Sequence, residues 1–445
     1  MRRQRDFTQG SIWKDLFYFS SPIMFAQLLQ VSYQFIDSLW VGNLIGANAL
    51  GSVAVSGTVI FTILSFIIGM NNTTLTVLSQ QKGKGNEQGV QTYVNAFVVT
   101  LSVLAVMMGI LGFLFAPAVL ALLGTPEAMM TDAVIYLRIN AAGIIFLVGY
   151  NFISTALRAV GDSKTPLKFV AIAVLLNIVL DPLFISVFEL GVQGAAIATI
   201  LSQGFSFIYG MVFVIRKQLI PIKWPTLPAW SEVKLILNLG IPSGLQMAVI
   251  SAGAAAIISV VTSHGEAAVA GYSAAQRLDS LFLLPAHALG ATVNSMAGQN
   301  IGVGQWQRVK KIATYGVLYN TVVMLVFAGL IVLFADFGIQ LFIQEQAAVQ
   351  FGAQYLLIIA FFYPFLGINF VLNGIVRASG AMYQVLILNL ISFWLLRYPL
   401  AYLFSELMGE DGIAYGIGVS FMLSSVIAFL YYRYGKWREK KIFSD

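Results

Sequence analysis

The stretch Gln80-Gln81-Lys82-Gly83-Lys84-Gly85 recurs 219 positions later as Gln299-Asn300-Ile301-Gly302-Val303-Gly304. Two further segments recur at the same shift: Tyr136-Leu137 as Tyr355-Leu356, and Arg158-Ala159-Val160-Gly161 as Arg377-Ala378-Ser379-Gly380. One offset that holds across half of the chain indicates an internal duplication rather than a chance recurrence of glycine-rich loops. The sequence therefore predicts two structurally similar halves.

The composition predicts that both halves lie in a membrane. Of the 445 residues, 58% are hydrophobic and only 10% are charged, which is outside the range of soluble domains. Apolar runs long enough to cross a bilayer recur along the whole chain. We predict an all-α polytopic membrane protein with twelve transmembrane helices in two pseudo-symmetric six-helix bundles. The predicted spans are 15–42, 50–79, 89–116, 131–158, 165–188, 191–215, 235–262, 269–298, 309–335, 350–377, 383–406 and 411–434.

The even number of spans in each half predicts how the halves are related. Both halves then enter the membrane from the same side, as parallel repeats about an axis along the membrane normal, which is an arrangement of alternating-access transporters. We expect an N-terminal lobe at 1–218, a basic linker with three prolines at 219–234, and a C-terminal lobe at 235–445.

The positive charges predict the orientation. Lys and Arg fall in the N-terminal arm and in every second predicted loop, whereas the alternate loops carry only acids, which is the positive-inside pattern. Both termini are therefore expected in the cytoplasm and the chain in the cell membrane. Because topology explains the net charge of +6, we expect no nucleic-acid partner. The first apolar stretch is too long for the core of a signal peptide, so we expect it to remain as the first span.

The residue content excludes several kinds of chemistry. The chain has no cysteine, which rules out disulfides, thiolate metal sites and cysteine nucleophiles. His264 and His287 are the only histidines, so histidine-based acyl transfer is disfavoured. Paired aspartates also form intramembrane proteases, but neither a Tyr-Asp nor a Gly-x-Gly-Asp pattern surrounds Asp37 or Asp181. We expect no enzymatic activity and no cofactor beyond a coupling ion.

Two acids, Asp37 and Asp181, lie deep inside apolar segments. A carboxylate at membrane depth costs several kcal/mol, so it indicates an ion or proton site. Tyr33 lies four residues before Asp37, on the same helix face, where its phenol can hydrogen-bond the carboxyl group. Asn177 has the same spacing from Asp181, and Pro182 then removes a backbone donor and loosens the helix.

Together these features resemble the multidrug and toxic compound extrusion (MATE) family. The resemblance rests on the repeated Gln-x-x-Gly-x-Gly loop, the paired Arg-Ala-x-Gly segments, and Asp37 within Phe35-Ile36-Asp37-Ser38. It is closest to the DinF-like branch, which implies a coupling site in the N-terminal half; Tyr136 and Thr199 match the remaining polar positions of that site. The NorM-like branch instead places acids in the seventh and tenth spans. Here the seventh has none and the tenth has only Asn373, although Asp279 leaves a C-terminal site open.

The resemblance implies secondary active efflux of organic cations and drugs by antiport against H⁺. Protonation of Asp37, with Asp181, would be the coupling step of alternating access and would bend the first span near Pro22. Na⁺ is the less favoured coupling ion, with a possible site at Asn177, Asp181 and Thr199. We expect a monomer in contact with membrane lipid and a substrate held between the halves. Candidate substrate-binding residues are Asp37, Gln30, Asn151, Phe152, Met70 and Phe207, since methionine and aromatic surfaces suit flat cations.

Simpler interpretations remain open at this point. Asp37 could form a structural ion pair with Arg138 or Arg397, Asp181 could cap the helix break at Pro182, and Asp279 is favoured as structural. The methionines and phenylalanines could serve only packing or lipid contact. A lipid-precursor flippase of the wider superfamily would share the architecture. It should, however, have a basic cavity for pyrophosphate, and the only arginines away from the ends of the predicted spans are Arg138, Arg277 and Arg397.

Overall fold

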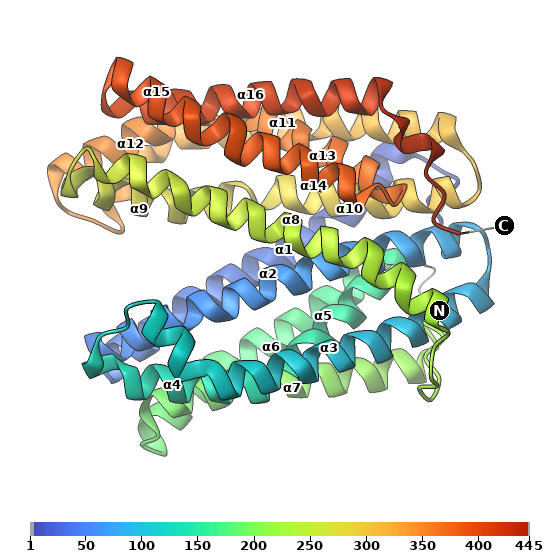
Figure 1. The fold of residues 1–445 in the computed structure, drawn as a ribbon, viewed down its shortest axis with the longest axis horizontal. Coiled ribbons are helices and arrows are strands. Elements are labelled where there is room, and N and C mark those ends of the chain that lie inside the picture. The colour runs from blue at the N-terminus through green and yellow to red at the C-terminus, as the bar shows by residue number, and fades with distance from the viewer. Residues whose placement is uncertain (1–3, 444–445) are drawn as a thin grey trace. The chain divides into compact units, whose positions relative to one another are not determined.

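The computed structural model describes residues 4–443, and within this range every regular element is a helix (Figure 1). Helices satisfy their own backbone hydrogen bonds, as a bilayer requires. The predicted all-α class is confirmed. The first half contains α1 (Ile12–Leu44), α2 (Ala47–Gly83), α3 (Glu87–Leu122), α4 (Glu127–Ala142), α5 (Ile144–Ala159), α6 (Lys164–Pro182), the π-helical turn η1 (Leu183–Val187) and α7 (Gly191–Arg216). The second half contains α8 (Trp230–Thr262), α9 (Glu266–Phe282), α10 (Leu284–Gly302), α11 (Trp306–Gln340), α12 (Gln346–Ala360), α13 (Tyr363–Ala378), α14 (Met382–Leu390), the π-helical turn η2 (Ile391–Arg397), α15 (Tyr398–Met408), α16 (Glu410–Tyr434) and the 3₁₀ turn η3 (Lys436–Glu439).

The helices form two compact units. Unit 1 contains residues 4–5 and Phe25–Asn238, and unit 2 contains Asp6–Met24 and residues 239–443. Two long helices therefore contribute to both units: α1 changes unit after Met24 and α8 changes unit after Asn238. Each of these helices carries a proline near that point, Pro22 in α1 and Pro242 in α8.

Most helices are long and apolar enough to cross a membrane. Among the described residues, eight helical segments meet this condition, and two bent helix pairs raise the number to ten if each pair is one span. The remaining two predicted spans, 15–42 and 269–298, are helical as α1 and as α9 with α10. α1 is less apolar because it carries Gln27, Gln30, Gln34 and Asp37. Of these, Gln30 and Asp37 belong to the site described below.

Breaks in the helices repeat between the halves. The fourth predicted span bends by 49° between α4 and α5 at Gly143, and the tenth bends by 55° between α12 and α13. The fifth and eleventh contain the π-helical turns η1 and η2, each next to a proline, Pro182 or Pro399. Such turns are frequent at functional sites. Here η1 follows directly on Asp181 and Pro182.

The second Gln-x-x-Gly-x-Gly loop has a clear structural role in unit 2. The Gln299 Oε1 accepts a hydrogen bond from the Phe7 amide at 3.0 Å, and the Asn300 Nδ2 donates to the Phe7 carbonyl at 2.9 Å. The loops of both halves end on a glycine in the left-handed region, Gly85 at φ 67° and Gly304 at φ 72°. A side chain is strained in that region, which accounts for glycine at this place in both copies.

α10 and α13 approach each other closely through small residues, as membrane helices commonly do. A Cβ atom built on Gly374 would lie 2.5 Å from the Gly290 carbonyl oxygen, whereas one built on Gly329 of α11 meets nothing within 4 Å. Gly374→Ala should therefore lower stability by about 1–3 kcal/mol through overpacking. Gly329→Ala should be neutral or stabilising, because alanine is the better helix former. Thermal melting of both variants in detergent checks this, and equal melting temperatures would contradict the close contact.

Candidate functional site

The two carboxyl groups predicted from the sequence meet inside unit 1. Asp37 lies on α1 and is 8% exposed, and Asp181 lies at the end of α6 and is fully buried. The two carboxyl groups lie close enough to interact electrostatically. Two buried acids that interact in this way bind protons as a pair rather than as two independent groups.

Asn177 connects this pair to α7. The Asn177 Nδ2 donates to the Asp181 Oδ1 at 3.0 Å, as the four-residue spacing on α6 predicts, and also lies 3.5 Å from the Thr199 Oγ1. Thr199 itself donates to the Ala195 carbonyl at 3.0 Å, so its oxygen is free to accept from the amide. The side chains of α6 and α7 are thereby held in one orientation beside the acids.

Two tyrosines complete the cluster. Tyr33 on α1 lies within electrostatic reach of Asp37 and Asp181, and Tyr136 on α4 lies within electrostatic reach of the same two acids and of Tyr33. The structure thus brings together all six residues proposed from the sequence for coupling. They are Tyr33, Asp37, Tyr136, Asn177, Asp181 and Thr199.

Several oxygens of the cluster have unused hydrogen-bonding capacity within the protein. The Asp37 Oδ1, the Asp181 Oδ2 and the Asn177 Oδ1 are buried and have no hydrogen-bond partner in the protein. Buried polar atoms are nearly always satisfied, and exceptions mark functional places or sites for a small species. A proton, a water molecule or a small cation would satisfy them.

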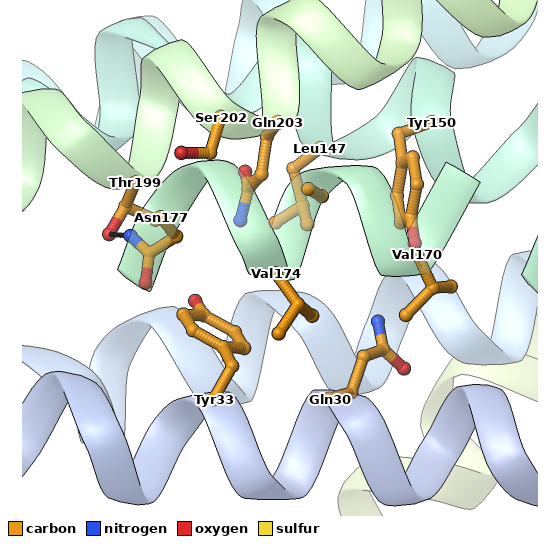
Figure 2. A pocket seen from close by; sticks show the side chains of 11 residues that line it. Gln30, Tyr33, Leu147, Tyr150, Val170, Val174, Asn177, Thr199, Ser202 and Gln203 are labelled. Carbon is orange, nitrogen blue, oxygen red and sulfur yellow. Dashed lines mark hydrogen bonds between the residues drawn. The ribbon is translucent and has the colours of Figure 1, made fainter. Parts of the chain in front are cut away.

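A small cavity lies beside the cluster (Figure 2). Its volume is about 40 Å³, and its wall combines the polar side chains of α1, α5, α6 and α7 with valine, leucine and alanine. In Figure 2, Asn177 and Thr199 lie next to each other, with Tyr33 and Gln30 on the α1 side and Ser202 and Gln203 on the α7 side. Sequence reasoning did not single out Tyr150, Ser202 or Gln203, because only the helix packing shows which faces they share.

The proposed substrate-binding residues are only partly found here. Gln30 lines the cavity, but Asp37, Asn151, Phe152, Met70 and Phe207 do not. The Asn151 amide donates to the Leu147 carbonyl, Met70 is buried, Phe152 packs against Phe97, and Phe207 packs against Phe146 with centroids 6.3 Å apart. These four side chains serve helix packing or their own helix rather than the wall of this cavity.

The arginines considered as partners for Asp37 lie elsewhere. The Arg138 Nε donates to the Phe113 carbonyl at 3.1 Å, and its guanidinium lies over the Phe113 ring. Arg397 belongs to unit 2 and lies over the rings of Phe393 and Phe421. The structural ion pair proposed as an alternative for Asp37 is therefore not formed with either arginine.

Asp279 of α9 is the centre of a second polar cluster, inside unit 2. Its carboxyl group accepts a hydrogen bond from the Tyr363 hydroxyl and one at 3.4 Å from the Gln276 amide, and it interacts with Tyr355 and Arg397. Tyr355 is the repeat equivalent of Tyr136, which was the one sequence signal for this arrangement. The surrounding donors leave Asp279 better satisfied than the pair in unit 1.

The donor set does not suggest a transition-metal centre. Among residues 4–443, no three His, Cys, Asp or Glu side chains gather where they could hold a metal ion. The oxygens around Asp181 remain the place where a monovalent cation would find ligands.

Comparison with known proteins shows the family to which the chain is related. A profile of the MatE family matches residues 22–183 and 242–403, one match in each half. The chain is 59% identical to the probable multidrug resistance protein YpnP of Bacillus subtilis (strain 168), over 99% of both chains. It is 26% identical to the FAD transporter of Shewanella oneidensis, over 96% of both chains.

The fold is also that of solved transporters. The structure of the Vibrio cholerae MATE transporter VcmN in the bent form superposes with a TM-score of 0.91, at 23% identity, over 98% of this chain and 99% of that chain. The two family matches, 220 positions apart, agree with the duplication seen in the sequence. The chain belongs to the MatE family of membrane transporters and is not an enzyme.

Proposed function

We propose that this chain exports organic cations and drugs by antiport against protons, with Asp37 and Asp181 as the coupling site. The observation that carries the proposal is the pair of buried, interacting carboxyl groups in unit 1. Two neighbouring carboxylates in a buried place are unfavourable when both are charged, so we propose that the pair takes up and releases a proton when its surroundings change. The name of the 59% identical relative, a probable multidrug resistance protein, supports drugs as the substrate class.

Protons suit the site better than Na⁺. Asp37, Asp181 and Asn177 each leave one buried oxygen unpaired, which would give a sodium ion three protein ligands. A proton needs only the carboxyl pair itself, and the Asn177 amide already occupies the other Asp181 oxygen. Proton coupling through this half of the chain would agree with membership of the DinF-like branch.

The energetics are sufficient for a conformational switch. Burying a carboxylate without a proton costs several kcal/mol at membrane depth. A membrane potential adds about 2.3 kcal/mol for each charge moved through 100 mV. We propose that protonation from outside the cell removes the charge, releases the substrate and lets the lobes, 1–218 and 235–445, change access, after which the proton leaves to the cytoplasm.

The proposed orientation follows from the loops. Helix ends with Lys82, Lys164 and Arg216 would face the cytoplasm together with both termini, and the acidic loops would face outward in the cell membrane. We propose that one chain suffices for transport, since the coupling residues all come from unit 1.

The relative named FAD transporter suggests an anionic compound as the second candidate for the substrate. Such a substrate needs cationic side chains at its binding site, as a lipid-linked pyrophosphate would. The 59% identical relative, named a probable multidrug resistance protein, favours drugs over such an anion.

The test is transport by the purified chain in vesicles. Ethidium efflux should be driven by an imposed pH gradient and should be unchanged by an imposed sodium gradient. Efflux driven by sodium alone would replace the proton with Na⁺ as the coupling ion. Efflux under neither gradient would overturn the antiporter proposal, and transport of FAD in place of ethidium would overturn the substrate class.

A further inference from the structure

The cavity in unit 1 lies on one side of the acid pair. α6 runs from Lys164 to Asp181, and the cavity residues Val170, Val174 and Asn177 precede Asp181 along it. On α1, Gln30 and Tyr33 precede Asp37, and on α7 Ser202 and Gln203 follow Thr199 toward Arg216. All three helices therefore place the cavity between the acids and the end of unit 1 that carries Lys164 and Arg216. We call this the basic end.

The size of the cavity decides what can occupy it. A drug-sized ligand needs a pocket of about 300–1,000 Å³. The cavity measures about 40 Å³, whereas a water molecule needs about 10–15 Å³ of such space. It therefore has room for about two or three water molecules and excludes the substrate.

The wall of the cavity has the chemistry that buried water requires. A buried water makes about three hydrogen bonds and needs two to four polar partners. Four hydroxyl groups and three amide groups are available in the wall: Tyr33, Tyr150, Thr199, Ser202, Gln30, Asn177 and Gln203. Figure 2 shows them distributed around the space rather than gathered on one side. Two or three waters can therefore be bonded both to the wall and to one another.

We propose that this cavity holds a short water chain that carries the proton from the Asp37–Asp181 pair toward the basic end, with Ser202 and Gln203 as its positioning residues. The proposal rests on the proton antiport proposed above. Asn177 connects the cavity to the acids, because it lines the cavity and donates a hydrogen bond to the Asp181 Oδ1 at 3.0 Å. Tyr150, at the cavity wall on α5, lies within electrostatic reach of Arg158 near the basic end.

The transfer is balanced without any further reactant. The O–H bond of the carboxyl group breaks as a new O–H bond forms on a hydroxyl or water oxygen, and that oxygen passes a different proton to the next. The carboxylate keeps its electron pair, and one proton leaves at the far end of the chain. Water chains of this kind act as proton carriers in other active sites.

A filled cavity should slow proton release without changing how many protons are released. Ala173 lines the cavity, and Ala173→Leu adds three carbon atoms to it. Ala171 lies two residues away, does not line the cavity and faces elsewhere, so Ala171→Leu on the same helix is the matched control. Protons released by the purified protein on addition of ethidium are followed with a pH-sensitive dye. In Ala173→Leu the rate should fall at least about tenfold, with the amount released and the ethidium affinity unchanged.

A second pair of variants keeps the test decisive if the leucine disturbs folding. Gln203→Leu removes a polar partner of the waters and should slow release to a similar degree, whereas Gln203→Asn keeps an amide and should restore most of the rate. Equal rates for Ala173→Leu, Ala171→Leu and the wild type would overturn the water chain while leaving the antiporter intact. If the wild type itself released no protons, the proposed function would fail first.

Discussion

Asp37→Asn is expected to abolish export of ethidium driven by a pH gradient. The amide has nearly the size of the carboxyl group and can keep its hydrogen bonds, but it cannot take up or release a proton. The Asp37 site would then remain permanently in its neutral form, so a pH gradient could no longer be converted into a change of access. Loss of a group essential to a proton-transfer step costs about 10²–10⁴-fold in rate, and efflux from vesicles should fall to the level of protein-free vesicles.

The matched control is Asp336→Asn, the same chemical change at an exposed position on α11 of unit 2. It should transport as the wild type does. Thermal melting of both variants separates loss of function from loss of fold, and Asp37→Asn should melt no lower than the wild type because it removes a buried carboxyl group. Substantial proton-driven efflux by Asp37→Asn would show that the coupling acid lies elsewhere, with the Asp279 cluster as the next candidate.

Much of the fold was predictable because the decisive signals are long and repeated. Twelve apolar segments and one constant shift predict a duplicated helical membrane protein, and neither depends on detailed packing. The bends within the fourth and tenth spans were not predicted. The run 131–158 breaks at Gly143, where a Cβ atom would lie 2.5 Å from the Ile200 side chain. That contact with another helix is invisible in a local apolar run.

Some features of the candidate site were likewise predictable from the sequence, and others were not. The pairs Tyr33–Asp37 and Asn177–Asp181 follow from spacing along a single helix. For the second pair, the structure shows the hydrogen bond that the Asn177 amide donates to the Asp181 carboxyl group. Tyr136 and Thr199 came only from the family resemblance, since nothing local marks them. Three features depend on which faces of different helices meet: the proximity of the two acids, the water-sized cavity, and the position of Tyr363 beside Asp279. Periodicity in a uniformly apolar helix does not specify those faces.

Asp181→Asn is expected to weaken export strongly without abolishing it, and the double variant with Asp37→Asn should be no worse than Asp37→Asn alone. In Asp181→Asn, Asp37 keeps a dissociable proton, and the side-chain oxygen of the introduced asparagine can still accept the hydrogen bond from Asn177. Asp37 loses, however, the neighbouring acid with which it forms one proton-binding unit. Residues that act as a unit give strongly non-additive losses, because once Asp37→Asn has removed the shared step the second substitution has nothing further to impair.

A double-mutant cycle on the free energy of unfolding in detergent measures the coupling between the two acids directly, since it does not need residual efflux in the Asp37→Asn variants. Residues in contact commonly show interaction energies of about 0.5–3 kcal/mol, whereas distant independent sites add within about 0.5 kcal/mol. Asp37 and Asp181 should fall in the first group. The corresponding cycle between Asp37 and Asp279, which lie in different units, should be additive if the unit 2 cluster is structural. Additive losses for the first pair would mean that each acid acts alone, and the shared proton between them would have to be abandoned even if both remain essential.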